Sequence, residues 1–279
     1  MDYLKQCHIG FIGGGNMAKA ICEALVRKGI RYSQIYVSGP HEEKLDGWKK
    51  KGACVSIENG KIAEEADIIF LAVKPHILAA AVANIYDTIS TPSKAANKLF
   101  VSILAGVKLD SLEKILSRLE GSRVIRVMPN TPMMVGEGCS VYCPGQQATD
   151  FDTVLVKTIL ELSGICQLVP ESMIDAIGAL AGCGPAFIYL IIEAMSDGGV
   201  KMGIPRTMAT SFAAQTVLGA AKMVLETKKH TGVLKDEVCS PGGTTITGIH
   251  ALETGGVRVA IMNAIEAATK KSEELGHKK

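Results

Sequence analysis

A glycine-rich turn near the N-terminus is the first segment whose residue types and spacing point to chemistry. Residues 13–18 read Gly-Gly-Gly-Asn-Met-Ala, a G-x-G-x-x-A pattern between a β-branched run and a helical pattern. Gly13 permits a tight turn, Gly15 lets the backbone approach a pyrophosphate, and Ala18 allows close packing of helix on strand. The helix N-terminus offers free N–H groups to phosphates. In this context the motif predicts a dinucleotide site, and a plain glycine turn is the alternative.

The end of the second predicted strand indicates which dinucleotide is bound. NAD-specific folds place a carboxylate about 20 residues beyond the glycines, where it accepts bonds from the ribose hydroxyls. Here residues 37–40 read Val-Ser-Gly-Pro and contain no carboxylate. Ser38 and exposed backbone N–H groups can donate to a 2′-phosphate, which a carboxylate would repel. NADPH is therefore favoured, and NADH stays possible because no arginine stands at this position.

Two other positions belong to the same predicted edge. Lys74, in the Ala-Val-Lys-Pro segment 72–75, ends a strand where doubly wound sheets bind ligands. It can contact ribose or substrate, or it is a surface lysine that ends the strand. Asn59, in the loop before that strand, can reach the adenine side.

A second chemical signal opens a helix far along the chain. Residues 238–246 read Val-Cys-Ser-Pro-Gly-Gly-Thr-Thr-Ile. Ser240 suits the N-cap, Pro241 suits the first turn, and the two glycines leave backbone N–H groups unshielded. Such a helix start suits a small carboxylate, and a purely structural turn is an equal alternative.

The elements that must position these residues change character near residue 170. Up to there, β-branched runs alternate with helical stretches, which predicts a parallel sheet with crossover helices. Several runs are apolar on both faces, as a covered sheet requires. The expected strands span 7–13, 34–38, 66–73, 98–104, 122–130 and 164–169, with 139–143 strand-like, and the expected helices span 17–28, 76–86, 109–119 and 152–162.

Beyond Ser172 only helical patterns remain. The expected helices span 172–181, 185–201, 205–227, 244–254 and 257–275. The fold class is therefore α/β, with an N-terminal Rossmann-type doubly wound sheet over 1–170 followed by an all-α dimerisation domain over 171–279. The stretch 205–225 holds only Arg206 and Lys222 as charges, so it needs a partner on nearly every face. We expect an intimate homodimer; a central helix in a monomer is the alternative.

Composition excludes several classes of partner. The 279 residues carry a net charge of +2, and the scattered basic residues argue against nucleic acid. The longest apolar run, 186–192, is far short of a bilayer span, so we expect no membrane segment. Eight cysteines without paired C-x-x-C spacing predict no metal site and free thiols that mostly fill the core. A strand pattern that begins by His8 leaves no room for a leader, which predicts a cytoplasmic location.

Several longer motifs follow one another along the chain. They are GFIGGGNMA, FLAVKP, VMPNTP, LAGCGPAFIY, DGGVKMGIP and SPGGTTI followed by GIHALE. In this order they resemble the motifs of the pyrroline-5-carboxylate reductase family. The resemblance implies reduction of 1-pyrroline-5-carboxylate to L-proline by NAD(P)H, and dimers through interleaved C-terminal helices, often assembled into decamers. By matching position it implies cofactor residues Ile12, Gly13, Gly14, Gly15, Asn16, Met17, Ser38, Asn59, Ala72, Val73, Lys74, Pro75 and Ala105, and substrate residues Gly242, Gly243, Thr244 and Thr245. Gly39 departs from a hydroxyl or charged residue in many relatives, which leaves the choice of cofactor open.

The implied reaction needs neither a nucleophile nor a metal. A protonated imine is already electrophilic, so the protein has mainly to align the two rings and hold the carboxylate. Thr245, at the helix start, is the expected catalytic residue because its hydroxyl can bond the ring nitrogen. A β-hydroxyacid dehydrogenase would need a lysine within 185–197, and none is there. A non-catalytic NADP-sensing protein is the alternative from another class.

Overall fold

The computed structural model describes residues 1–277, and the chain folds into two compact units. The first unit comprises Met1–Cys183 and the segment that begins at Ala268, and is called the sheet unit here. The second unit comprises Gly184–Ala267 and is called the helical unit. The expected boundary at 170 lies inside the sheet unit. Segment 171–183 stays with the sheet because Ile174 packs on Val141 and Val169 in one buried cluster.

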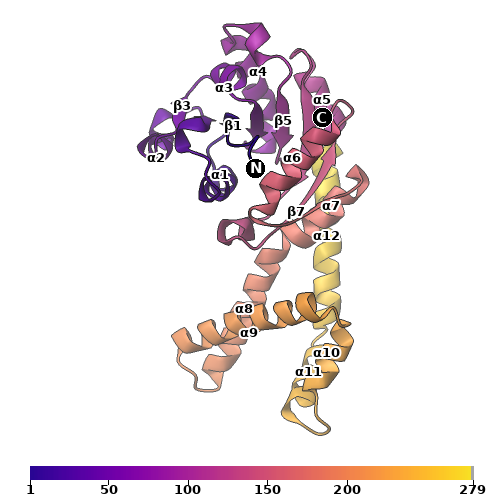
Figure 1. Cartoon of the computed structure of the whole chain (residues 1–279). Helices are drawn as coiled ribbons and strands as arrows, with labels where there is room; N and C mark the ends of the chain where they lie inside the picture. Colours follow the sequence, from indigo (N-terminus) through magenta and orange to yellow (C-terminus); the bar gives the residue numbers. More distant parts are fainter. Residues whose placement is uncertain (278–279) are drawn as a thin grey trace. The chain divides into compact units, whose positions relative to one another are not determined.

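An eight-stranded sheet with the order β3-β2-β1-β4-β5-β6-β7-β8 forms the centre of the sheet unit (Figure 1). Its strands are β1 Ile9–Ile12, β2 Ile35–Ser38, β3 Cys54–Ser56, β4 Ile68–Leu71, β5 Leu99–Ser102, β6 Arg123–Met128, β7 Gly138–Pro144 and β8 Gly164–Leu168. The first six run parallel, as expected, whereas β7 pairs antiparallel with β6 and parallel with β8. Ile12 lies opposite both Ser38 and Leu71, so β1, β2 and β4 end together at one edge.

Helices cover both faces of this sheet, because its central strands are apolar on both sides. One buried cluster joins side chains of α1 Asn16–Arg27, α2 Asp46–Lys50 and α6 Asp150–Glu161 to one face. Another joins α3 Asn59–Glu65, α4 Leu78–Thr88 and α5 Leu109–Leu116 to the opposite face. The doubly wound prediction is confirmed. The short elements α3 and β3 were not predicted, since seven and three residues give too little periodicity to detect.

The expected helix 172–181 is present, but it is irregular. A 3₁₀ turn at Glu171–Met173 leads into α7 Ile174–Ile177, and a π-helical segment follows at Gly178–Gly182. A Cβ on Gly182 would come within 2.8 Å of the Met128 side chain. The segment therefore packs its glycines against the end of β6, which a regular periodicity does not reveal.

The helical unit consists of α8 Gly184–Lys201, α9 Arg206–Thr227, α10 Thr231–Val238, α11 Thr244–Thr254 and the first part of α12 Val257–His277. Of these only α10 was not expected. Two stretches, Glu171–Lys201 and Arg206–Thr227, are long and apolar enough to cross a membrane by length and composition. This differs from the expectation of no such segment. A helix of this length and composition can be covered either by lipid or by the surface of another protein.

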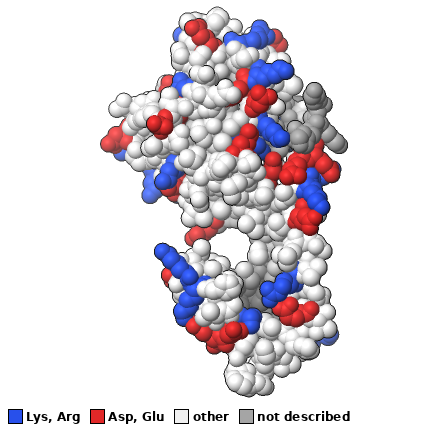
Figure 2. Space-filling model, turned by 90° about the vertical axis from the view of Figure 1, so that its right-hand side faces the viewer, with Lys and Arg blue, Asp and Glu red and all other residues white. Residues whose placement is uncertain are grey.

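Charge on the surface is mixed in sign. On the face drawn in Figure 2, lysine and arginine side chains lie among aspartate and glutamate side chains and form no continuous basic field. The basic run at 49–51 ends α2, and Lys51 pairs with Glu23. This face therefore offers no phosphate-tracking stripe of the kind that nucleic acids need.

Candidate active site

The glycine turn takes its shape from the strands beside it. Gly13 has φ +102°, and a Cβ there would come within 2.6 Å of the Ala72 carbonyl oxygen. Its N–H donates to the Ser38 carbonyl at 2.9 Å, while the Ala72 N–H donates to the Ile12 carbonyl at 2.8 Å. Only glycine combines this backbone conformation with so close an approach of two strand ends.

The next two glycines, Gly14 and Gly15, have different surroundings. A Cβ on Gly14 would lie 2.7 Å from Trp48 Nε1, and that indole N–H donates to the Gly14 carbonyl at 3.2 Å. Gly15 is exposed, and a Cβ there would meet nothing within 4 Å. Asn16 then begins α1. The open backbone at Gly15, just before a helix N-terminus, leaves room for a phosphate.

A cavity of about 390 Å³ opens beside this turn, at the carboxyl edge of the sheet. Five of the residues expected to bind cofactor line it: Ile12, Gly13, Ser38, Asn59 and Val73. The rest of the wall is mainly apolar and comes from Gly39, Pro40, Ile57, Ile77, Ala80, Ala81 and Asn84. An apolar pocket with a few polar groups at the carboxyl edge of the strands is the usual form of a dinucleotide's adenosine site.

The other expected cofactor residues lie outside the cavity wall. Gly14, Gly15, Asn16 and Met17 continue the turn into α1, and Ala72, Lys74 and Pro75 follow the end of β4. Ala105 is exposed in the turn after β5. All of these follow the carboxyl ends of parallel strands, the edge where ligands of such sheets bind.

Ser38 provides a test of whether the cavity fits a cofactor. Its side chain is fully buried, and within the described chain its Oγ has no hydrogen-bond partner. A buried hydroxyl without a partner is costly unless a ligand supplies one. The free hydroxyl on the cavity wall therefore fits a ribose or 2′-phosphate oxygen at this position.

Asn59 corrects one expectation. It is not in a loop but is the first residue of α3, and its side chain is buried. Its Nδ2 donates to the Ala81 carbonyl at 2.9 Å, and its backbone N–H donates to Asn84 Oδ1 at 2.7 Å. Sequence reasoning missed both Asn84 and Trp48, because neither contact is local in the chain.

The expected substrate loop belongs to the helical unit. Gly242 has φ +66°, and Gly243, not Ser240, is the N-cap of α11. Ser240 lies one turn earlier, where its carbonyl accepts the Gly243 N–H at 3.0 Å. The helix begins at Thr244, exposed, and Thr245, half-buried. The first N–H groups of a helix have no partner within it, so this end can hold a carboxylate.

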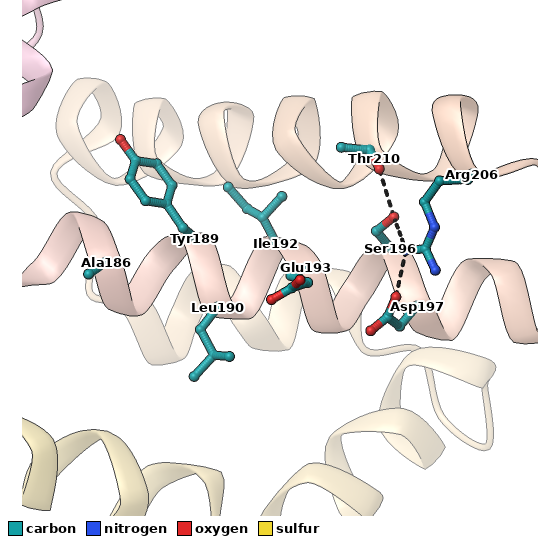
Figure 3. Close-up of a pocket in the computed structure, with 9 residues that line it drawn as sticks. All are labelled: Ala186, Tyr189, Leu190, Ile192, Glu193, Ser196, Asp197, Arg206 and Thr210. Atoms are coloured by element: carbon teal, nitrogen blue, oxygen red, sulfur yellow. Dashed lines mark hydrogen bonds and ion pairs between the residues drawn. The ribbon is translucent and has the colours of Figure 1, made fainter.

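A larger hollow of about 770 Å³ lies on the helical unit between α8 and α9. Figure 3 shows Arg206 reaching from α9 to Ser196 and Asp197 on α8. Ser196 is buried and also bonds Thr210 at 2.8 Å, so this polar cluster joins the two helices. Exposed Tyr189 and Leu190 form much of the remaining wall. The hollow is an open surface with mixed polar and apolar walls and not a closed site.

The cysteines are not mainly core residues, contrary to expectation. Only Cys7 and Cys22 are buried, and Cys54 and Cys183 are exposed. Burial raises the pKa of the Cys22 and Cys166 thiols to about 12, which keeps them protonated and unreactive at neutral pH. Among the residues that the structure describes, no three potential metal ligands gather.

Comparisons with known proteins agree with this layout. A family model described as pyrroline-5-carboxylate reductase dimerisation matches residues 171–275, and one described as NADP oxidoreductase, coenzyme F420-dependent, matches residues 8–106. The chain is 47% identical to a pyrroline-5-carboxylate reductase of Methanosarcina acetivorans, covering 99% of this chain and 100% of that one. It is 43% identical to one of Arabidopsis thaliana, covering 96% and 95%.

Solved structures show the same similarity over both units. A pyrroline carboxylate reductase of Plasmodium falciparum with NADP bound has a TM-score of 0.86 at 32% identity, covering 98% of this chain and 99% of that one. A pyrroline-5-carboxylate reductase of Coxiella burnetii has a TM-score of 0.84 at 36% identity, covering 96% and 98%.

Proposed function

The chain belongs to the pyrroline-5-carboxylate reductase family, and we propose how its own residues divide the work of that reaction. The enzyme reduces the cyclic imine 1-pyrroline-5-carboxylate to L-proline with a nicotinamide cofactor. In our assignment the sheet-edge cavity holds the adenosine half of the cofactor. The open turn at Gly15 and the start of α1 hold the pyrophosphate. The N-terminus of α11 holds the substrate carboxylate.

The chemical step depends on the alignment of the nicotinamide and pyrroline rings more than on reactive side chains. A bound NAD(P)H supplies the hydride that adds to the imine carbon, and the ring nitrogen ends protonated. Backbone N–H groups of Gly242 and Thr244 are proposed to hold the carboxylate. The Gly243 N–H donates to the Ser240 carbonyl, so the proposed part of Gly243 in substrate binding is to leave the loop without a side chain there. The Thr245 hydroxyl is proposed to bond the ring nitrogen and keep or relay its proton. Fixing both rings in this way supplies catalysis through proximity and orientation.

We propose NADPH as the preferred form of the cofactor. Ser38 supports this, because it places a free hydroxyl where NAD-specific folds place a carboxylate. The NADP bound to the Plasmodium relative also supports it. NADH use stays possible, since no arginine or lysine lines the cavity.

We propose a homodimer through the helical unit, with the decamer implied by the family as a higher assembly. The support is the exposed apolar surface of α9, where Phe212 is 62% and Leu225 is 71% exposed in the single chain. A second copy covers such a surface without a membrane, and the dimerisation family model spans these residues. A cytoplasmic location stays a prediction from the sequence.

The observation that carries this assignment is the partnerless Ser38 hydroxyl in a cavity formed by five expected cofactor positions. The test is an assay of NADPH and NADH oxidation at 340 nm with 1-pyrroline-5-carboxylate as substrate. Turnover with KM for NADPH at or below that for NADH supports the assignment. A clearly lower KM for NADH would contradict the role given to Ser38.

A further inference from the structure

The far wall of the sheet-edge cavity is formed where α3 packs against α4. Here the Asn59 backbone N–H donates to Asn84 Oδ1, and the Asn59 Nδ2 donates to the Ala81 carbonyl. The Gly60 N–H donates to Thr88 Oγ1 at 2.8 Å, and that hydroxyl donates to the Asn84 carbonyl. Both asparagines line the cavity, whereas Thr88 does not.

These bonds determine the orientation of both side-chain amides. A backbone N–H must face an oxygen, so Oδ1 of Asn84 faces α3. A backbone carbonyl must face an NH₂ group, so Nδ2 of Asn59 faces α4. Two polar atoms are left over, the acceptor Oδ1 of Asn59 and the donor Nδ2 of Asn84. Neither has a hydrogen-bond partner elsewhere in residues 1–277.

An acceptor and a donor carried by neighbouring cavity residues match one edge of adenine. The exocyclic amino group donates, and the ring nitrogen beside it accepts, which is the pattern that asparagine reads on adenine in nucleic acids. The surrounding wall is Ile57, Ile77, Ala80 and Ala81. These aliphatic side chains suit the flat faces of a base and compete for none of its polar atoms.

We propose that Asn59 and Asn84 together recognise the adenine base of the cofactor, and that Asn84 also positions Asn59. The inference rests on the proposed function, since it takes the sheet-edge cavity as the adenosine site. Oδ1 of Asn59 accepts from the adenine amino group, and Nδ2 of Asn84 donates to the adjacent ring nitrogen. The nicotinamide ring, and not the adenine, takes part in the reaction. We therefore expect the loss of adenine recognition to raise the KM for the cofactor and to leave kcat unchanged.

The direct test compares NADPH with its hypoxanthine analogue, in which a carbonyl oxygen replaces the amino group. That oxygen would face Oδ1 of Asn59, acceptor against acceptor. We expect KM for the analogue to be roughly 5- to 20-fold higher at unchanged kcat, the size of one or two lost hydrogen bonds. Equal KM values for the two cofactors in the unmodified enzyme would overturn the proposal.

Two variants separate recognition from structure. Asn84→Asp keeps an oxygen for the Asn59 N–H but removes the donor, so thermal stability should hold while KM for NADPH rises several-fold. Thr88→Val removes a bond from the same α3–α4 contact without touching the cavity. It should lower stability and leave the hypoxanthine-to-adenine KM ratio unchanged. If Asn84→Asp left KM for NADPH unaltered, Asn84 would be structural and the proposal would fail.

A third variant, Ser38→Asp, distinguishes failure of the adenine proposal from failure of the proposed function. If the cavity binds the cofactor but adenine is not recognised, Ser38→Asp still raises KM for NADPH while the base analogue has no effect. If the cavity is not the cofactor site, neither Ser38→Asp nor Asn84→Asp changes KM for any cofactor. Both results overturn the adenine proposal, and only the second also overturns the site assignment.

Discussion

The sheet unit and the helical unit bury their apolar residues to very different degrees. Every position of β1, β4 and β5 is buried, and two large clusters fill the two faces of the sheet. In the helical unit, Ser196, Ala209 and Ala213 are the buried residues among those described. Its helices instead expose large side chains such as Phe212 and Leu225.

This contrast shows which unit can be stable by itself. Burial of apolar surface is the main stabilising term in folding, at about 25 cal/mol per Å². The sheet unit gains it within one chain. The helical unit gains this stabilisation only when something covers α8 and α9, and the family model described as pyrroline-5-carboxylate reductase dimerisation matches these residues. Four predictions test the contrast, from the largest expected effect to the smallest.

A charge on α9 should destroy the assembly. If a second copy covers Phe212, the substitution Phe212→Glu buries an unpaired carboxylate, which costs about 3 kcal/mol or more. The dimer dissociation constant should then rise at least about 100-fold, with loss of activity at low enzyme concentration. Light scattering and an activity titration measure both effects.

Val154→Glu on α6 is the matched control, because Val154 is also 62% exposed but lies on the sheet unit. It should leave assembly and activity close to those of the unmodified enzyme. A stable, active monomer of Phe212→Glu at micromolar concentration would show that the helical unit needs no partner.

Within the sheet unit, alanine substitutions at two glycines of one motif should have different effects, one on stability and the other on cofactor binding. Gly13→Ala places a Cβ against the Ala72 carbonyl at positive φ, and the backbone strain alone costs roughly 1–3 kcal/mol. Its melting temperature should fall. Gly15→Ala meets open space, so stability should hold while KM for NADPH rises roughly 10-fold, because the methyl group occupies the approach of the phosphate. Thermal unfolding and steady-state kinetics separate the two, and identical behaviour would contradict this division.

On the helical unit, Thr245→Ala should slow the reaction without loosening the cofactor. Loss of one hydrogen bond in a partly desolvated site costs roughly 1–3 kcal/mol, or about 5- to 150-fold in kcat/KM for the imine. KM for NADPH should hardly move. Thr244→Ala is the control, and its effect on stability should exceed its effect on rate. Full activity of Thr245→Ala would mean that the proton arrives already on the imine or comes from solvent.

Ser38→Asp should produce the smallest effect, confined to one cofactor. A carboxylate beside a 2′-phosphate repels it, so KM for NADPH should rise roughly 10-fold while KM for NADH changes little. Ser38→Ala should not reduce stability, since the hydroxyl has no partner to lose in the described structure. Equal KM changes for both cofactors in Ser38→Asp would remove Ser38 from the phosphate site.

Local signals in the sequence were enough for much of the fold and for part of the candidate site. The glycine spacing, the apolar strands and the charge-poor α9 each depend on residues within one element, so periodicity and residue type reveal them. For the same reason the expected bounds of α11, Thr244–Thr254, match those observed. The roles of Thr245 and of the substrate loop came from the family resemblance and stay predictions.

The tertiary structure decided whatever depends on residues far apart in the chain. It placed Asn59 at the start of α3, where the sequence had predicted a loop. It also brought the Trp48 indole to the Gly14 carbonyl and the Asn84 side chain to the Asn59 N–H. It also reversed β7 and returned the end of α12 to the sheet unit. Side-chain to backbone bonds between residues 25 or 34 positions apart leave no periodic trace in sequence. The sequence alone therefore determined that a dinucleotide turn and a helical partner surface exist, while packing determined which side chains line the cavity beside that turn.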